Sequence, residues 1–264
     1  MPRRIISISN QKGGVGKTTT AINLGASLAL LGQQTLIIDL DPQANATTGL
    51  GLDPATLQAH MYHVMLGQQP LDAVITASKV SGLFLAPSHT DLVGTDVELM
   101  DVSMRERIIA NAIGGLVTPF DFLIIDCPPS LGLLTLNALT ASHSLLIPVQ
   151  CEYYALEGIK SLLNTFQLVK KRLNPSLVIE GFLLTMFDTR TRLSHEVSVN
   201  MRDHFNSQVF TTVIPRNTRL CEAPSHGLPI CLYDISSKGA QHYLMLAKEL
   251  LSREVVNEGK ASTR

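Results

Sequence analysis

Short apolar runs of strand length alternate along this chain with longer stretches in which apolar residues recur at helical spacing. The first pair is a run at residues 5–8, followed by a helical pattern that reaches Leu31 and stops at Gly32. The same reasoning predicts strands at residues 35–39, 82–87, 120–126, 144–149 and 177–186, and helices at residues 159–173, 194–205 and 239–251. This alternation, without an internal repeat, predicts an α/β fold with a doubly wound, mostly parallel sheet flanked by helices.

Three other parts of the chain are less regular. Residues 50–69 hold only short helical patterns, and residues 91–114 are expected to be helical. The polar tail, from about residue 252, is expected to fray. The length of 264 residues is ample for a real core, and we expect a single domain over residues 1–264.

The connection between the first strand and the first helix carries the clearest chemistry, and it reads SNQKGGVGKTTTA. Gly13, Gly14 and Gly16 lack a Cβ, so the backbone can turn its N–H groups towards phosphate oxygens. The N-terminus of the following helix attracts the same negative charge. Lys17 can reach the β and γ phosphates of a nucleotide, and the Thr18 hydroxyl can bind Mg²⁺. The segment is therefore predicted to be a phosphate-binding loop.

The start of this loop departs from the usual pattern G-x-x-x-x-G-K-[ST]. Counted back from Lys17, the first glycine should fall on Gln11, and a second lysine, Lys12, follows it. A lysine in a loop is often only a solvated charge. At this position it adds a second cation near the expected phosphates.

Aspartates stand where two predicted strands end. One strand leads to Asp39 and Asp41, and another ends at Asp126. Carboxylates at the carboxyl ends of strands beside a phosphate loop are placed to meet Mg²⁺ or the water that attacks the γ-phosphate. Strands that end in aspartate are common, so Asp126 indicates a Mg²⁺ site only in combination with the glycine loop. Asp39 has a second interpretation, as a carboxylate that hydrogen-bonds the loop.

Charge is unevenly distributed along the chain. The net charge is −1, but residues 1–159 carry 7 Lys and Arg against 13 Asp and Glu, and residues 160–264 carry 14 against 9. The basic second half indicates either a local anion-binding face or a chance distribution on a solvated surface.

Composition narrows the classes of protein to which the chain can belong. No apolar run approaches the ~18 residues needed to cross a membrane, and the one after the N-terminal arginines is too short for a signal peptide. These features favour a cytoplasmic protein. The cysteines form no C-x-x-C pair and the eight histidines show no zinc-ligand spacing, so we expect reduced, mostly buried thiols. The four cysteines are Cys127, Cys151, Cys221 and Cys231.

Two segments of the second half are candidates for holding a nucleotide base. One reads TMFDTRTR and follows a predicted strand, and the other, residues 212–220, is predicted as a strand that runs into a loop. Loops at the carboxyl ends of strands, away from the phosphates, are placed to contact the base. Each arginine in these loops has an alternative role in a surface ion pair. Together they are a candidate anion-binding cluster.

These motifs resemble a known family. KGGVGKTT resembles the deviant Walker A box of the ParA/MinD group of P-loop ATPases. DPQxNAT, DCPPSLGLLT, PVQCEYYALEG and IPRNxRLxEAPSHG resemble the chromosomal ParA, or Soj, branch of that group. The resemblance extends from Ile5 to Leu251, and Cys221 stands where the branch has serine. It implies a deviant-Walker P-loop fold and slow, Mg²⁺-dependent hydrolysis of ATP.

The resemblance also implies roles for single residues. Lys12 would reach across a dimer interface to the partner's nucleotide, Asp41 would serve hydrolysis and Lys17 would bind phosphate, which makes these three the catalytic set. The expected Mg²⁺ residues are Thr18, Asp39 and Asp126. The expected nucleotide-binding residues are Lys12, Gly13, Gly14, Val15, Gly16, Lys17, Thr18, Thr19, Met186, Asp188, Pro215, Arg216 and Asn217. The expected DNA-binding residues are Arg190 and Arg219, with Arg192, Arg216 and Lys248 as helpers.

Partners follow from the same resemblance. ATP binding is expected to form a sandwich homodimer that binds double-stranded DNA without sequence preference, in the nucleoid. A ParB-type centromere-binding protein is expected to stimulate hydrolysis. No helix-turn-helix extension precedes Ile5, so the chain resembles the short form of the family, and no membrane partner is expected.

Two alternatives share the glycine box. A MinD-like membrane ATPase requires a C-terminal amphipathic helix with bulky apolar and basic faces, which the polar tail lacks. A reductase of the nitrogenase type requires paired cysteines that hold an iron–sulfur cluster. Cys127 lies beside Asp126, but no second cysteine follows at a matching place.

Overall fold

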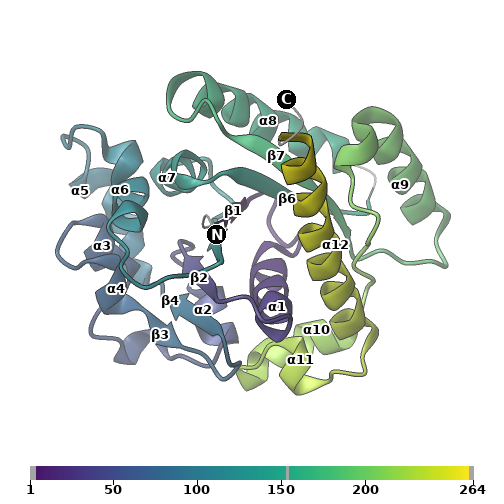
Figure 1. Ribbon diagram of the computed structural model, residues 1–264, viewed down its shortest axis with the longest axis horizontal. Coiled ribbons are helices and arrows are strands. Elements are labelled where there is room, and N and C mark those ends of the chain that lie inside the picture. The colour runs from purple at the N-terminus through teal and green to yellow at the C-terminus, as the bar shows by residue number, and fades with distance from the viewer. Residues whose placement is uncertain (1–3, 153–154, 262–264) are drawn as a thin grey trace.

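A seven-stranded sheet in the order β3-β4-β2-β5-β1-β6-β7 organises the computed structural model of the chain (Figure 1). The structure describes residues 4–152 and 155–261, without the side chains of residues 155–158 and 254–261. All neighbouring strands are parallel except β3 and β4. The strands are β1 (Arg4–Ile8), β2 (Thr35–Asp39), β3 (Thr76–Ala77), β4 (Leu83–Ala86), β5 (Phe122–Asp126), β6 (Ser144–Gln150) and β7 (Val178–Thr185).

Helices cover both faces of this sheet (Figure 1). The longer ones are α1 (Lys17–Leu30), α6 (Ile108–Gly114), α7 (Leu133–Ala141), α8 (Ala155–Arg172), α9 (Arg192–Phe205) and α12 (Lys238–Ala261). The shorter α-helices are α2 (Asn45–Gly49), α3 (Met61–Met65), α4 (Leu71–Val74), α5 (Thr95–Glu98), α10 (Thr218–Glu222) and α11 (Ile230–Tyr233). The 3₁₀ turns are η1 (Pro54–Thr56), η2 (Thr90–Gly94), η3 (Arg105–Arg107), η4 (Asn206–Gln208) and η5 (Ala223–His226).

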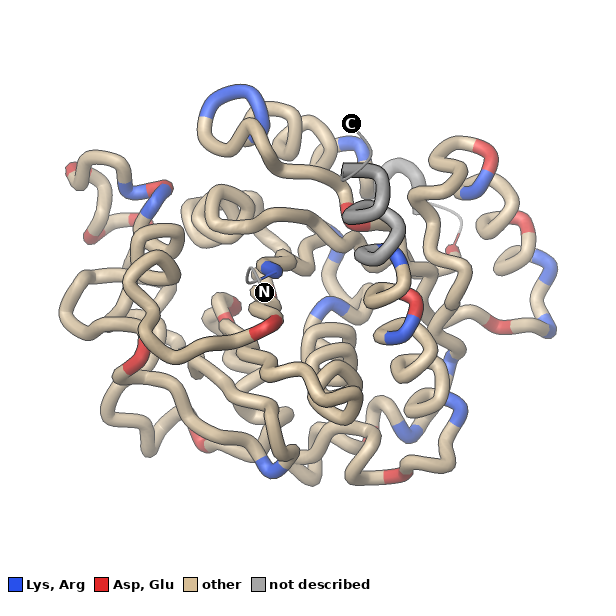
Figure 2. The backbone as a smooth tube through the Cα atoms, viewed as in Figure 1, with Lys and Arg blue, Asp and Glu red and all other residues tan. Residues whose placement is uncertain are grey.

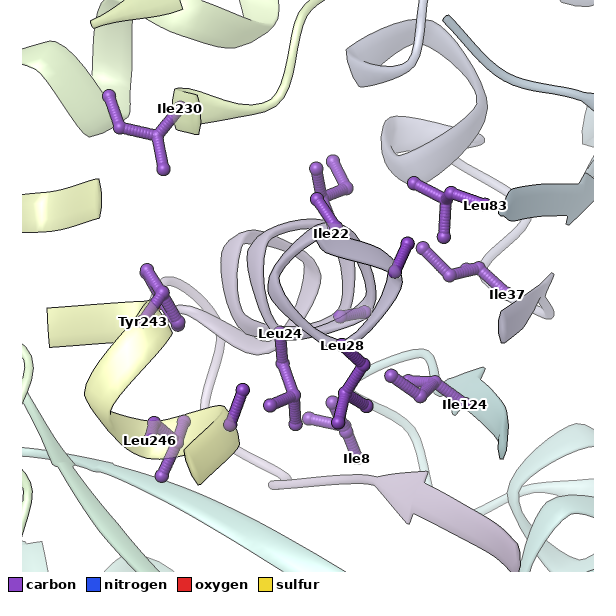
Figure 3. Close-up of a cluster of buried hydrophobic side chains, with 14 of the residues drawn as sticks. Ile8, Ile22, Leu24, Leu28, Ile37, Leu83, Ile124, Ile230, Tyr243 and Leu246 are labelled. Carbon is purple, nitrogen blue, oxygen red and sulfur yellow. The ribbon is translucent and has the colours of Figure 1, made fainter. Parts of the chain in front are cut away.

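The first helix packs its apolar side directly onto the sheet. Leu24 and Leu28 point to Ile8 of β1 and Ile124 of β5, and Tyr243 of α12 lies beside them (Figure 3). All five side chains are almost fully buried. Burial of one such side chain stabilises the fold by roughly 1.5–3 kcal/mol, so this cluster holds α1, and with it the glycine loop, against the sheet.

The opposite face of the same strands carries a second core. Ile5, Leu36 and Ile125 face α3, α6 and α7, because successive side chains of a strand point to opposite faces. A third core lies under α8 and α9 beside β7. Strands buried on both faces account for the continuous apolar runs of the sequence, and the predicted doubly wound α/β fold is confirmed.

Residues 212–220 are predicted as a strand that runs into a loop, and the strand part of this prediction is wrong. The segment runs beside β7 through isolated hydrogen bonds: Ile214 N donates to Leu184 O at 2.8 Å, and Phe187 N donates to Ile214 O at 3.0 Å. Arg216 N also donates to Phe187 O at 3.1 Å, but Met186, with φ of 51°, interrupts the β7 side of the pairing, so no continuous ladder forms. The chain then turns, and the Asn217 side chain accepts from Arg219 N to begin α10.

The structure also differs from the sequence prediction elsewhere in the chain. The helix expected over residues 91–114 is divided into η2, α5, η3 and α6, and β3 is an edge strand that the pattern did not predict. The polar tail, which is expected to fray, is assigned to the end of α12 as far as Ala261. Side chains of most of that tail, and of Tyr153 and Tyr154 in the motif PVQCEYYALEG, lie outside the described residues.

Candidate nucleotide-binding site

The glycine loop connects the carboxyl end of β1 to the N-terminus of α1. Gly14 and Gly16 have φ of 74° and 88°, in the left-handed region that residues with a Cβ rarely adopt. Asn10 fixes the start of the loop, because its side chain donates to Pro148 O at 2.7 Å and accepts from Lys12 N at 3.0 Å. Gly13 and Gly14 are exposed, so the open side of the loop can receive a ligand.

Lys17 lies at the first position of α1 and is only 7% exposed. Its ammonium group donates to Lys12 O at 3.2 Å, inside the loop. Burial lowers the pKa of Lys17, while the charges of Asp126 and Asp41 oppose that shift. A cation is therefore held between the loop and two carboxylates, where the phosphates of a nucleotide would add negative charge.

The carboxylate of Asp126 is buried without the hydrogen bonds that such a group usually has. Both of its oxygens are buried and have no hydrogen-bond partner of good geometry within the described residues. Burial raises its pKa well above the usual range, and the charges of Asp39 and Asp41 act in the same direction. The nearby Thr18 hydroxyl and the Lys17 ammonium oppose the rise. Buried oxygens without partners require a ligand, and carboxylate with hydroxyl is the donor set that Mg²⁺ prefers.

Asp39 is equally buried but is hydrogen-bonded. One oxygen accepts from the N–H and the hydroxyl of Thr47 at 2.9 and 2.8 Å, and the other accepts from Asp41 N at 3.1 Å. Burial raises the pKa of Asp39 to about 7, against the effect of these hydrogen bonds. β2 and β5 bring Asp39 and Asp126 together as register partners.

Asp41 lies just beyond β2 and is 6% exposed. Its side chain accepts from Gln43 N at 3.0 Å, and its carbonyl accepts from the Ser88 hydroxyl at 2.6 Å. Ser88 N in turn donates to the hydroxyl of Thr47, which holds Asp39. Ser88 and Thr47 therefore fix the segment that carries both aspartates. The sequence pattern contained no signal for Ser88.

A cavity of about 380 Å³ continues from the loop and suits a nucleotide base. It starts at Gly16 and Thr19 and is otherwise lined mainly by apolar groups. Four residues that the sequence suggested for nucleotide binding line the cavity: Met186, Pro215, Arg216 and Asn217. The rest of the lining is Thr185, Ile214, Thr218, Leu220, Cys221, Pro224 and Tyr243. A mainly apolar cavity with a few polar groups is the usual form of a small-molecule site.

Asp188 does not line this cavity. It turns away and binds the guanidinium of Arg190, which lowers the Asp188 pKa through two side-chain hydrogen bonds. Thr185, which sequence reasoning missed, ties the cavity to the loop by donating to Val15 O at 2.8 Å. Its place at the carboxyl end of β7, a usual position for ligand contacts, is the signal that could have indicated it.

Lys12 extends from the loop to a carboxylate of its own chain. Its ammonium group forms an ion pair with Glu152, which follows β6, and about two fifths of the Lys12 side chain is exposed. Glu152 was not predicted as a site residue. Lys12 is thus near the surface and held by the carboxylate of Glu152.

Three of the expected DNA-binding arginines form ion pairs on the surface. Arg190 binds Asp188 at 2.8 Å, Arg192 binds Glu196 at 2.7 Å, and Arg219 binds Glu222 at 2.9 Å. The structure therefore agrees with the alternative role of each arginine in an ion pair. Lys and Arg nevertheless line the side of the molecule where α9 and α10 lie (Figure 2). Arg216 and Lys248 are exposed.

The four cysteines are free. Cys127 and Cys151 are buried, and burial raises the pKa of both thiols. Within residues 4–152 and 155–261, none of them belongs to a group of three metal-ligating side chains. The described part of the chain also contains no helix whose length and apolar character would let it cross a bilayer.

A left-handed glycine loop at the edge of a parallel sheet, with a buried lysine, a paired set of aspartates and an adjoining cavity, defines a P-loop nucleotide-binding protein. A family profile described as "AAA domain" matches residues 3–179. Curated relatives and sequence motifs narrow this class, and the chain belongs to the ParA/Soj family of chromosome-partitioning ATPases.

The similarity extends over nearly the whole chain. It is 52% identical to the chromosome partitioning protein ParA of Myxococcus xanthus, over 95% of this chain and 89% of that protein. It is 53% identical to the sporulation initiation inhibitor protein Soj of Bacillus subtilis, over 94% of this chain and 98% of that protein. Among solved structures, a cobyrinic acid a,c-diamide synthase of Mycobacterium smegmatis with bound ADP and magnesium has a TM-score of 0.84 and 37% identity, over 95% and 94% of the two chains.

Proposed function

We propose that this chain is a slow, Mg²⁺-dependent ATPase whose ATP-bound form is a sandwich dimer that binds double-stranded DNA without sequence preference. A ParB-type centromere-binding protein would stimulate hydrolysis and so release the DNA. The observation that carries the proposal is the buried Asp126 carboxylate, without partners among the described residues, beside Lys17 and the glycine loop. Solved structures of similar chains contain ADP or an ATP analogue together with magnesium, which supports ATP and Mg²⁺ as the ligands of this chain.

The phosphates are held by the loop in this proposal. The N–H groups of residues 13–19 and the Lys17 ammonium surround them, and the cavity with Met186, Pro215 and Asn217 holds the base. Thr18, Asp126 and Asp39 would hold Mg²⁺, Asp39 directly or through water. Bound Mg²⁺ neutralises charge that develops on the phosphates.

Asp41 is the group proposed to orient the attacking water. It is buried at the end of β2, and its charge acts on both Lys17 and Asp126, which supports a position beside the phosphates. The site offers positioning groups and one carboxylate, so hydrolysis is expected to be slow until a partner completes the site.

Dimerisation is proposed to depend on Lys12. With ATP bound, Lys12 would leave Glu152 and contact the partner's phosphates, because two γ-phosphates offer more negative charge than one carboxylate. Exposed apolar side chains near the loop that follows Asp126 are candidates for burial in the same interface. They are Val93, Val97 and Met100, and Asp96, beside Val97, approaches Gly132 in that loop.

DNA binding is proposed for the face around α9 and α10. The pairs of Arg190, Arg192 and Arg219 with acidic side chains are largely exposed, and exposed pairs contribute only about 0–1 kcal/mol. A DNA phosphate can therefore replace the carboxylate at little cost. Two such faces on one dimer would raise the affinity through avidity.

One experiment tests the proposal as a whole. The size of the protein is measured with ADP, with ATP, and with ATP plus Mg²⁺, using Asp41→Ala to prevent turnover. We expect a dimer only with ATP, and DNA binding only by the dimer. The same size in all states, or equal DNA affinity with ADP and ATP, would contradict it.

A further inference from the structure

Three side chains that could bind a metal meet far from any motif of the sequence. His60 immediately precedes α3, and His89 and Asp91 lie at the start of η2. One ligand atom of each lies within 4.8 Å of the other two. The rings of His60 and His89 are stacked, with centroids 4.4 Å apart. α3, which follows His60, and α5, which follows Asp91 in sequence, lie at the left of Figure 1.

His60 is the deepest member of the group, and one of its ring nitrogens has no hydrogen bond of good geometry within the described residues. It is 4% exposed, and its Nδ1 atom is buried with no hydrogen-bond partner among the described residues. Buried polar atoms are almost always hydrogen-bonded, so this nitrogen requires a ligand. Burial lowers the pKa of His60 to about 4, and the neighbouring His63 and His89 act in the same direction. The ring is therefore neutral at physiological pH, which is the form that binds metals.

His89 and Asp91 form the outer side of the group. His89 Nδ1 lies 3.0 Å from an Asp91 carboxylate oxygen and accepts a long hydrogen bond from Asp91 N at 3.3 Å, which a metal ion would replace. The Asp91 side chain is 54% exposed, so an ion can enter from solvent. Zinc bonds of about 2.0–2.2 Å place neighbouring ligand atoms of a tetrahedral site roughly 3.3 Å apart. This pair already has that spacing, and side-chain rotations can close the longer separations to His60.

We propose that His60, His89 and Asp91 form a binding site for a divalent transition-metal ion of the Zn²⁺ type. Two imidazoles and one carboxylate leave the fourth tetrahedral position for water. Imidazole nitrogen favours Zn²⁺, Co²⁺ and Ni²⁺ over Mg²⁺, which prefers oxygen. The site is thus chemically distinct from the carboxylates near the phosphate loop.

The ion would stabilise a segment that reaches the nucleotide site. His89 follows Ser88, whose hydroxyl donates to Asp41 O at 2.6 Å and whose N–H donates to the Thr47 hydroxyl at 2.9 Å. On the other side, Met61 N donates to Pro87 O at 2.9 Å and joins the residue after His60 to the same segment. A bound ion would therefore hold the start of α3 and the segment after β4 together.

The probe is Zn²⁺, added in the presence of excess Mg²⁺. We expect one Zn²⁺ per chain by calorimetry, and a visible absorption band of a tetrahedral site when Co²⁺ replaces it. Loss of a ligand should weaken binding by at least about tenfold. His60→Ala and His89→Ala should each do so, and Asp91→Asn should weaken binding as well. A rise in the unfolding temperature with Zn²⁺ should be lost in the same variants.

Controls separate this site from other ligands. His204→Ala removes an exposed histidine of α9, Cys221→Ser removes an exposed thiol, and Asp126→Ala removes a carboxylate near the phosphate loop. None should change zinc binding. Absence of binding, or binding that survives His89→Ala and is lost in a control, would overturn the proposal. His89→Ala decides the result if His60→Ala fails to fold, because His89 is less buried.

Discussion

Asp39 and Asp126 are register partners at the carboxyl ends of adjacent strands, and both carboxylates are fully buried. Burial is the largest cause of the raised pKa of each, and their mutual repulsion adds to the rise at Asp126. Two buried carboxylates side by side are costly when both are charged. The sheet therefore concentrates, at its carboxyl edge, a negative charge that a bound cation would neutralise.

This relationship predicts a loss of stability as pH rises without Mg²⁺. The pKa of Asp39 is about 7 in the folded protein, against an ordinary value of 3.8 for an aspartate, so the folded state binds more protons between those limits. The free energy of unfolding then falls as pH rises from about 4 to about 7. Thermal unfolding across this range measures it. Asp39→Asn should reduce the slope, and Mg²⁺ should restore stability above pH ~7. A slope unaffected by the substitution would contradict the assignment.

Asp41→Ala should abolish turnover and keep ATP binding. The carboxylate is proposed to orient water, while Lys17 and the loop bind the phosphates, so a loss of about 10²-fold or more in rate is expected. Phosphate release and nucleotide binding are measured side by side. Asp53→Ala, which removes an exposed aspartate that caps η1, is the matched control. Unchanged hydrolysis in Asp41→Ala would move the role to another group.

Lys12→Ala should bind nucleotide yet remain monomeric with ATP, because the charge that contacts the partner's phosphate is gone. Size-exclusion chromatography with ATP and Mg²⁺ measures this, with the exposed Lys160 of α8 changed to alanine as a control. Glu152→Gln should act in the opposite direction and lower the concentration at which dimers form, since Lys12 is then released. Normal dimers of Lys12→Ala would exclude a role for Lys12 across the interface.

Arg190→Ala and Arg219→Ala should each weaken DNA binding equally on all sequences, without loss of basal ATP hydrolysis. Phosphate contacts give a log–log dependence on salt with a slope near −0.9 per phosphate, so each variant should make the slope shallower by about one unit. Binding isotherms at several salt concentrations test this. Lys79→Ala, an exposed lysine in the acidic half of the chain, serves as the control. Sequence preference that survives both arginine variants would refute the proposal.

Gly181→Ala should destabilise the fold by about 1–3 kcal/mol. A Cβ at this position of β7 would lie 2.8 Å from the backbone carbonyl of Gln208 and 2.7 Å from the ring of Phe210. Phe210 cannot move freely, because its backbone N–H donates to Phe182 O and the Phe210 ring is fully buried. Urea unfolding measures the change, with Gly114→Ala, where a Cβ meets nothing within 4 Å, as the control.

Local patterns in the sequence were sufficient for the parallel strands of the sheet and for the backbone of the glycine loop, but not for the edge strand β3. Alternating apolar runs predict buried parallel strands, and the glycines that adopt positive φ, Gly14 and Gly16, stand in a recognisable order. Asp39 and Asp126 were also predictable, because parallel strands always bring their carboxyl ends to one edge. Each of these features depends on residues that are close in sequence or on a general rule of sheet geometry.

Only the tertiary structure decided which distant residues meet. It pairs Lys12 with Glu152, brings Ser88 to Asp41 and stacks His60 on His89, although the spacing of the histidines had indicated no zinc site. It also replaces the predicted strand over residues 212–220 with a segment that only follows the edge of β7. Hydrophobic periodicity reports which face of an element is buried, but it contains no information on which other element covers that face. Which polar side chains become neighbours depends on which elements pack together, so their partners can be identified only in the folded chain.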